Sequence, residues 1–193
     1  MLTYSRIIGA ADLSAALFAE AWKIYEYSFP RNERRTLEDQ ELRMADDRYN
    51  FEVALNAEDE VVGIVCYWIF SDEEGAKNTE RDEDAAKYIY LEHLATSKEL
   101  RNGGFGAKTL DHLKSLNLPM LLEIEPPEDE LTRRRQGFYE RSGFVLNEYN
   151  HRHTPYRADT GDVTLRIMSY PTEFSRVKYD NFCRSQSSVM PKF

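Results

Sequence analysis

A run of glycines between a predicted strand and a predicted helix is the part of this sequence best suited to chemistry. The segment Arg101-Asn102-Gly103-Gly104-Phe105-Gly106-Ala107 follows the apolar run 88–96 and precedes a helical pattern. Glycines let backbone N–H groups approach an anion closely and adopt conformations that a Cβ atom forbids. The first turn of a helix adds unpaired amides and a partial positive charge. The segment therefore predicts a binding site for a phosphate or pyrophosphate group.

Two other phosphate-binding patterns fit this segment less well. A P-loop needs a glycine directly before its Lys-Ser/Thr pair, but Ala107 precedes Lys108-Thr109, and Asn102 occupies the position of the first glycine. A dinucleotide fingerprint needs a third glycine at the position of Thr109. A nucleotide-dependent enzyme is therefore a weaker interpretation. A glycine-rich helix start that serves packing alone stays open as an alternative.

The pattern that the segment matches in full is Arg/Gln-x-x-Gly-x-Gly/Ala, from Arg101 to Gly106. It resembles the CoA-pyrophosphate signature of the GCN5-related N-acetyltransferase (GNAT) family, and residues 92–113 resemble motif A of that family. The segment Gly137-Phe138-Tyr139-Glu140-Arg141-Ser142-Gly143-Phe144 is similar to motif B, at about the separation that the family shows. Ser28-Phe29-Pro30 followed by Glu33-Arg34-Arg35 also resembles a first-helix ending of many bacterial members. The resemblance covers residues 2–170.

The resemblance implies a layered α/β fold, in which helices flank a mixed, mostly antiparallel central sheet. It also implies that acetyl-CoA is the cosubstrate and that its acetyl group passes directly to an acceptor amine. The glycine segment would hold the pyrophosphate, and the end of the preceding strand would pair with the pantetheine arm through its backbone. The residues implied in cofactor binding are Leu94, Ala95, Thr96, Arg101, Asn102, Gly103, Gly104, Phe105, Gly106 and Ala107.

Two side chains are predicted to move protons in this reaction. An alkyl ammonium has a pKa of about 10, so a base is useful near neutral pH. Family members often place Glu or His on the central strand, and Glu92 stands there by count back from Arg101. The alternative is that Glu92 pairs with a basic neighbour such as Arg152. Tyr139 is the predicted general acid toward the leaving thiolate, and packing beside Phe138 is its alternative.

Two departures from the family pattern keep a second function open. The region 126–136 contains no Asn, although family members usually have one there that helps to hold the pantetheine arm. The segment 71–86 is longer than in a minimal member and carries seven acidic residues against two basic ones, which favours a solvated loop. A non-catalytic domain of the same fold that binds acyl-CoA is therefore the alternative function.

Three histidines call for interpretation. His151 and His153 stand two residues apart and share one face of a predicted strand, as metal ligands can. No third ligand stands out in the sequence, so no metal site is predicted. His93 follows Glu92 directly and is expected on the opposite strand face, in a structural role.

The predicted elements alternate in the way that an α/β layer fold requires. Helices are predicted from Asp12 or Ser14 to Tyr27 and over 37–44, 104–116 and 131–142, with Gly143 as a left-handed cap. Strands are predicted over 2–8, 51–56, 61–70, 88–96, 120–125, 144–149 and 163–170. This organisation predicts one GNAT domain over residues 1–170. Residues 171–193 form a C-terminal extension of unknown role, with room for one short helix.

Composition narrows the class of protein. The 193 residues carry a net charge of −9, which argues against a nucleic-acid binder because phosphate contacts need a basic stripe. No apolar run reaches the roughly 18 residues of a membrane span. Cys66 lies in an apolar run, where a buried free thiol is usual, and neither cysteine has metal spacing, so a cytoplasmic protein is expected. The expected partner is a small-molecule or peptide amine, and a homodimer is consistent with the resemblance.

Overall fold

The computed structural model describes residues 2–7, 14–72, 86–100 and 103–191. Its strands form a seven-stranded sheet in the order β1-β2-β3-β4-β5-β7-β6. The chain divides into two compact units, Met1–Trp68 with Leu91–Asn117 (the first unit) and Ile69–Tyr90 with Leu118–Phe193 (the second unit). Strands β3 (Val61–Ser71) and β4 (Lys87–Thr96) contribute residues to both units. The α/β fold with a sheet flanked by helices is confirmed.

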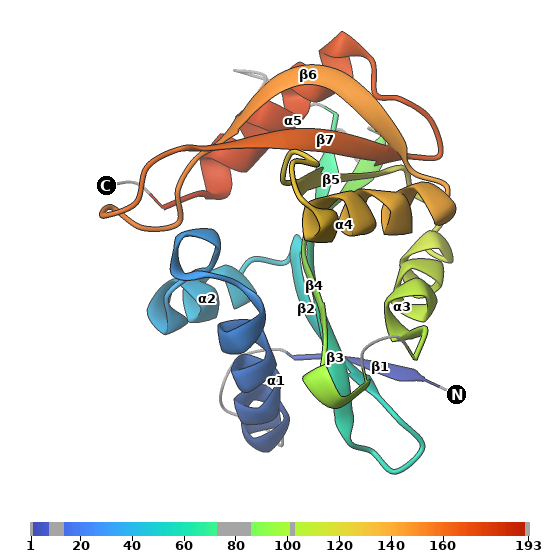
Figure 1. The fold of residues 1–193 in the computed structure, drawn as a ribbon. Helices are drawn as coiled ribbons and strands as arrows, with labels where there is room; N and C mark the ends of the chain where they lie inside the picture. The colour runs from blue at the N-terminus through green and yellow to red at the C-terminus, as the bar shows by residue number, and fades with distance from the viewer. Residues whose placement is uncertain (1, 8–13, 73–85, 101–102, 192–193) are drawn as a thin grey trace. The chain divides into compact units, whose positions relative to one another are not determined.

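The first unit places helices on both faces of its strands. β1 (Thr3–Arg6) pairs antiparallel with β2 (Tyr49–Leu55), which pairs antiparallel with β3. Helices α1 (Ser14–Ser28) and α2 (Leu37–Met44) lie on one side of these strands, and α3 (Phe105–Lys114) lies on the other (Figure 1). Every residue of β2 is buried, as expected for a strand covered on both faces.

Helix α2 has the bounds that the sequence predicts, because its start is fixed by a capping residue. Thr36 caps the helix, because its hydroxyl accepts a hydrogen bond from the backbone N–H of Asp39. The buried Gln40 side chain donates to the Tyr49 hydroxyl at 3.0 Å and ties the helix to β2.

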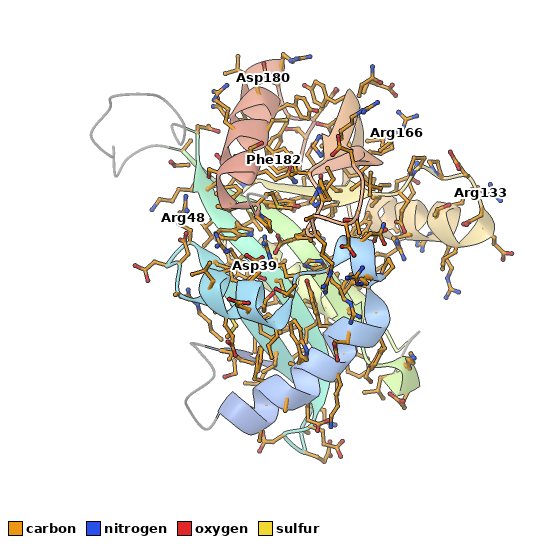
Figure 2. All side chains as sticks on the ribbon, turned by 90° about the vertical axis from the view of Figure 1, so that its left-hand side faces the viewer. Asp39, Arg48, Arg133, Arg166, Asp180 and Phe182 are labelled. Carbon is orange, nitrogen blue, oxygen red and sulfur yellow. The ribbon has the colours of Figure 1, made fainter. Side chains whose placement is uncertain are left out.

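The second unit is a sheet between two helices. β5 (Met120–Ile124) pairs antiparallel with β7 (Val163–Tyr170), and β7 pairs antiparallel with β6 (Val145–His153). Helices α4 (Glu130–Arg141) and α5 (Arg176–Val189) lie on opposite faces of this sheet, as Figures 1 and 2 show from two directions. Strand β6 is longer than predicted, because pairing with β7 resumes at His151 after an irregularity that follows Asn147.

Helix α5 is the largest difference from the predicted elements. It has 14 residues, starts after the Ser175 cap and buries Tyr179 and Phe182. In Figure 2 Phe182 points toward the sheet, whereas Asp180 points outward. The helix packs within the second unit, and the predicted domain boundary at residue 170 stays a prediction. No helix in the described part of the chain is long and apolar enough to cross a membrane.

Candidate functional site

The end of β4 carries the strand residues predicted to bind the cofactor. Ala95 is buried, whereas Leu94 and Thr96 are partly exposed. The Glu92 side chain is fully buried although the residue as a whole is partly exposed, so its exposed atoms are main-chain atoms. Main-chain groups along this stretch are thus accessible to an extended ligand, which is the arrangement that backbone pairing requires.

A close approach from β3 supports this stretch of β4. A Cβ atom on Gly63 would lie 2.8 Å from the Ala95 carbonyl oxygen, a distance that real Cβ contacts do not reach. Just beyond the strand, the Ser97 N–H donates to the Val62 carbonyl at 2.9 Å. Glycine at position 63 therefore lets the two strands lie unusually close. The role of Gly63 could not be predicted from the sequence, because it depends on the backbone of a strand about 30 residues later in the chain.

The predicted phosphate-binding turn is described from Gly103 onward, while Arg101 and Asn102 lie outside the described residues. Gly104 precedes α3 with φ of +76°, and an added Cβ atom would meet no heavy atom within 4 Å. No side chain caps this helix start within the described part of the chain. The amides of Phe105, Gly106 and Ala107 in the first turn are therefore oriented to bind an anion. A phosphate group fits this start both sterically and electrostatically.

Glu92 lies in a buried ion pair with Arg35. The Arg35 guanidinium donates to the Glu92 carboxylate at 2.6 Å, and both side chains have no exposed surface. The same guanidinium donates to Asp39 of α2, also at 2.6 Å. Burial alone would raise the pKa of the Glu92 carboxyl, but the Arg35 charge outweighs burial and holds this pKa well below its usual range. A basic partner for Glu92 was among the alternatives, but Arg35 was not singled out for it.

His93 does not lie as strand alternation predicts. Its Nδ1 is 3.7 Å from the Glu92 carboxylate, so the two neighbouring side chains are close together rather than apart. Its Nε2 faces the Glu33 carbonyl oxygen at 2.8 Å, and its ring packs edge-on against Tyr25 and Phe29. The expected structural role of His93 agrees with these contacts, whereas the expectation of opposite faces is wrong.

Tyr139, the predicted general acid, lies in α4 of the second unit. Its ring packs against Phe138 and Phe144 at centroid distances of 5.1 and 5.6 Å. No hydrogen bond to its hydroxyl exists among the described residues. Burial raises the pKa of Tyr139 to about 12, so the hydroxyl keeps its proton at neutral pH. Such a hydroxyl can donate a hydrogen bond to a bound ligand. Glu92 belongs to the first unit and Tyr139 to the second.

Comparison with known proteins decides the family. A family model for the acetyltransferase (GNAT) domain matches residues 47–146, just over half of the 193 residues. The chain belongs to the GNAT acetyltransferase family. A protein from Bacteroides thetaiotaomicron, provisionally named a GNAT acetyltransferase, has a similar structure with a TM-score of 0.78 and 26% identical residues over 97% of each chain.

Two further relatives differ in how much they share with this GNAT protein. YjbC of Bacillus subtilis, provisionally named an acetyltransferase, is 35% identical over 78 residues, which are 39% of this chain and 41% of YjbC. The match thus spans about two fifths of that relative's length. NAA60 of Arabidopsis thaliana, solved in complex with acetyl-CoA, has a TM-score of 0.58 and 13% identity over 88% of this chain and 98% of NAA60. The likeness to NAA60 therefore concerns the fold.

The GNAT protein contains a second cluster of ionisable groups, which was not among the predicted sites. The Glu123 carboxylate on β5 accepts hydrogen bonds from His151 and from His153, the latter at 3.0 Å, and from the Tyr90 hydroxyl at 2.5 Å. Gln186 of α5 also donates to it, at 3.0 Å. Glu123 is thus a third ionisable group beside the two histidines, and its position there could not be predicted from the sequence. The described residues nevertheless contain no group of three side chains arranged to hold a metal ion.

We expect this cluster to make the stability of the GNAT protein fall at alkaline pH. Burial alone would lower the pKa of His151, but Cys183 and Glu123 beside it raise this pKa from 6.5 to about 9. A raised pKa stabilises the fold fully below the unfolded value, and the stabilisation is lost as the pH rises through the folded value. The free energy of unfolding should fall by about 3 kcal/mol between pH 6.5 and 9.

Urea unfolding at pH 6.5 and pH 9 measures this loss. In His151→Gln most of the difference between the two pH values should disappear, because the titrating imidazole is gone. An equally large difference in the variant would show that other groups cause it. The Glu123 carboxyl acts in the opposite direction: its pKa is held well below the usual range by the histidines, so its contribution is present above pH 4.5 and is lost on acidification.

Proposed function

We propose that this GNAT protein transfers an acetyl group from acetyl-CoA directly to an amine of a small molecule or peptide. The observation that carries the proposal is the helix start at Gly104, which follows the partly exposed end of β4 and has no side-chain cap among the described residues. This turn falls within the segment that matches the GNAT domain. The NAA60 complex supports acetyl-CoA as the cosubstrate, because a protein of the same fold binds it.

Different parts of the chain would bind different parts of acetyl-CoA. Acetyl-CoA supplies an acetyl group activated as a thioester. The first-turn amides of α3 would hold its pyrophosphate, with Arg101 as the predicted ionic partner. The main chain of Leu94, Ala95 and Thr96 would pair with the pantetheine arm and orient the thioester. Gly63 would keep this part of β4 in place.

The proposal assigns proton transfer to Glu92 as base and Tyr139 as acid. For Tyr139 the protonated hydroxyl, which no described residue binds, supports the role. The ion pair with Arg35 restricts the role of Glu92 as a base, because a carboxylate bound by a guanidinium is only weakly basic. Glu92 would accept a proton only after Arg35 moves away.

A second candidate function follows if the Arg35–Glu92 ion pair does not open. If Arg35 stays in place, Glu92 holds the fold together rather than accepting protons. The GNAT protein would then bind acyl-CoA without turning it over, as a regulatory domain of the same fold. The two functions predict the same affinity for acetyl-CoA but different rates of thiol release.

Thiol release from acetyl-CoA, measured with a panel of amines, separates the two functions. Spermidine, glycinamide and a pentapeptide with a free N-terminus cover the main acceptor classes. We expect turnover with at least one amine, and we expect Tyr139→Phe to lower kcat on the order of 10²-fold with an unchanged Kd for acetyl-CoA. Tyr149→Phe is a matched control, because the Tyr149 hydroxyl donates to the Phe174 carbonyl at 2.7 Å, away from α4.

Two results would count against the proposed roles. Turnover of Tyr139→Phe equal to that of the unchanged protein would remove Tyr139 from proton transfer. Full activity of a folded Glu92→Gln variant would remove Glu92 as the base. Acetyl-CoA binding without thiol release for any amine would favour the non-catalytic function.

A further inference from the structure

Strand β6 forms one edge of the sheet. Within the described part of the chain the strand order ends at β6, and in Figure 1 the strand arches beside β7 as the outermost strand of the second unit. Among the described residues, the backbone-to-backbone hydrogen bonds of β6 run only to β7. The outer edge therefore presents backbone N–H and C=O groups with which a further strand can pair.

The side chains of β6 alternate between a face that α5 covers and a face exposed to solvent. Tyr149 belongs to the covered face, because its ring stacks on Tyr179 of α5 at a centroid distance of 4.0 Å. The residues that alternate with it on the other face are exposed: Glu148, Asn150 and Arg152. A strand added to this edge would therefore lie beside a short polar stripe with one negative and one positive side chain.

The two charges of this stripe have no partner among the described residues. Neither Glu148 nor Arg152 makes an ion pair or a side-chain hydrogen bond with any of these residues. They are four positions apart in the sequence, which is about 13 Å along an extended strand, so they cannot pair with each other. Arg152 was one expected partner of Glu92, whereas the structure pairs Glu92 with Arg35. Both side chains can therefore bind groups of another molecule.

A second copy of the same strand matches this charge pattern. When two copies of β6 run antiparallel about a two-fold axis at Asn150, Glu148 of each copy lies opposite Arg152 of the other. Side chains directly opposite in an antiparallel pair share a face, and their Cβ atoms are about 4.5–5.5 Å apart. Both ion pairs form together because the symmetry repeats every contact. The two Asn150 amides meet at the axis, where each can donate to the other.

Other antiparallel registers of the same two strands lack this match. Opposite residues must share a face, so the two-fold axis has to pass through a residue rather than between two residues. An axis at Glu148 or at Arg152 places like charges opposite each other, which is unfavourable. An axis at Tyr149 or at His151 leaves both charges opposite uncharged residues. The charges therefore specify the register that is centred on Asn150.

We propose that the outer edge of β6 pairs antiparallel with β6 of a second copy of this chain, centred on Asn150. Residues 148–150 lie opposite a single residue of β7, Arg166, so the middle of β6 bulges. Contact between two such edges is confined to a few residues around the bulge, and an interface of this size gives a weak, concentration-dependent dimer. The exposed ion pairs mainly set the register. The inference concerns the second unit alone and does not depend on acetyl transfer.

Sedimentation velocity of the whole chain tests whether the dimer exists. The dimer fraction should rise as the protein concentration increases from about 10 µM to about 1 mM. A protein that stays monomeric at about 1 mM would overturn the proposal.

Charge reversal tests the register. Glu148→Arg reduces the net negative charge of the chain, which by itself favours association, but it places positive side chains opposite each other. We expect this variant to raise the Kd of the dimer on the order of tenfold. Glu128→Arg is the matched control, because it makes the same charge change at an exposed residue between β5 and α4. The Kd of the control should equal that of the unchanged protein or be slightly lower.

A mixture of two variants provides the decisive comparison. Arg152→Glu should weaken the dimer as Glu148→Arg does, because it places negative side chains opposite each other. An equimolar mixture of these single variants should form a heterodimer as tightly as the unchanged protein dimerises, because each charge again lies opposite its counterpart. The double variant should likewise recover the homodimer. Single variants that dimerise as well as the unchanged protein, or a mixture that stays monomeric, would overturn the proposed pairing.

Discussion

Replacing Arg35 by methionine is expected to lower the free energy of unfolding by about 3–5 kcal/mol. The substitution keeps an unbranched side chain but removes the guanidinium, whose positive charge pairs with Glu92. Both side chains of this ion pair are fully buried and their charged atoms are 2.6 Å apart, so water cannot replace the guanidinium. Urea unfolding followed by circular dichroism measures the change.

The double substitution Arg35→Met with Glu92→Leu provides the decisive comparison. If the single variant is unstable because a negative charge is left buried, removing that charge should restore most of the stability. Lys23→Met is the control, because the Lys23–Glu20 pair is exposed and should contribute under about 1 kcal/mol. A double variant no more stable than Arg35→Met would show that the ion pair does not explain the loss.

Glu123→Ala is expected to have an effect of the same size in the second unit. The substitution removes the acceptor of four donors and leaves the His151 charge buried without its carboxylate. Loss of one partner from such a network typically costs about 3–5 kcal/mol. Glu123→Gln should be less severe, because it keeps an acceptor oxygen and the side-chain volume.

Asp180→Ala is the matched control for this prediction. Asp180 pairs with Arg176 on α5, but both side chains are exposed, so the free energy of unfolding should change by under about 1 kcal/mol. Equal stability of Glu123→Ala and Asp180→Ala would mean that the network does not hold α5 to the sheet. The measurement is urea unfolding at pH 6.5, where most of the expected contribution of His151 is present.

Several elements of the fold could be predicted because their signals are local. The bounds of α2 and β7 agree with the structure, and Gly143 adopts the expected left-handed conformation with φ of +85°. Thr36 and Asp39 fix the start of α2 within four residues of sequence. Cys66 is a buried free thiol, as its apolar surroundings predicted.

The length and burial of helix α5 and the end of β6 could not be predicted, because burial there depends on tertiary structure. Among the buried residues of α5 are Asn181, Ser185 and Gln186, whose polar side chains do not indicate burial in the sequence. Likewise, His151 and His153 belong to β6 through backbone pairing with β7, and their side chains are buried beside Glu123. Buried polar side chains that form hydrogen bonds with one another give no hydrophobic periodicity from which a buried helix or strand could be predicted.

In the candidate site too, the local features could be predicted and the long-range contacts could not. The glycine turn could be predicted, since a helix start and its glycines lie within a few residues. The partner of Glu92 could not be, because Arg35 is 57 positions away in the sequence. The distance between Glu123 and His153 is 30 positions, and their contact crosses the sheet. Ion pairs between residues far apart in the sequence, such as Arg35 with Glu92, therefore cannot be predicted from the local motif.

A calorimetric titration with acetyl-CoA, with ATP and NAD as controls, tests the central claim most directly. The proposed function predicts binding of acetyl-CoA with a Kd on the order of micromolar and no comparable binding of ATP or NAD. Gly104→Val, which places a β-branched side chain at a φ of +76° in the turn, should abolish that binding. Absence of acetyl-CoA binding by the unchanged protein would contradict the claim, because the turn after β4 would then serve the fold alone.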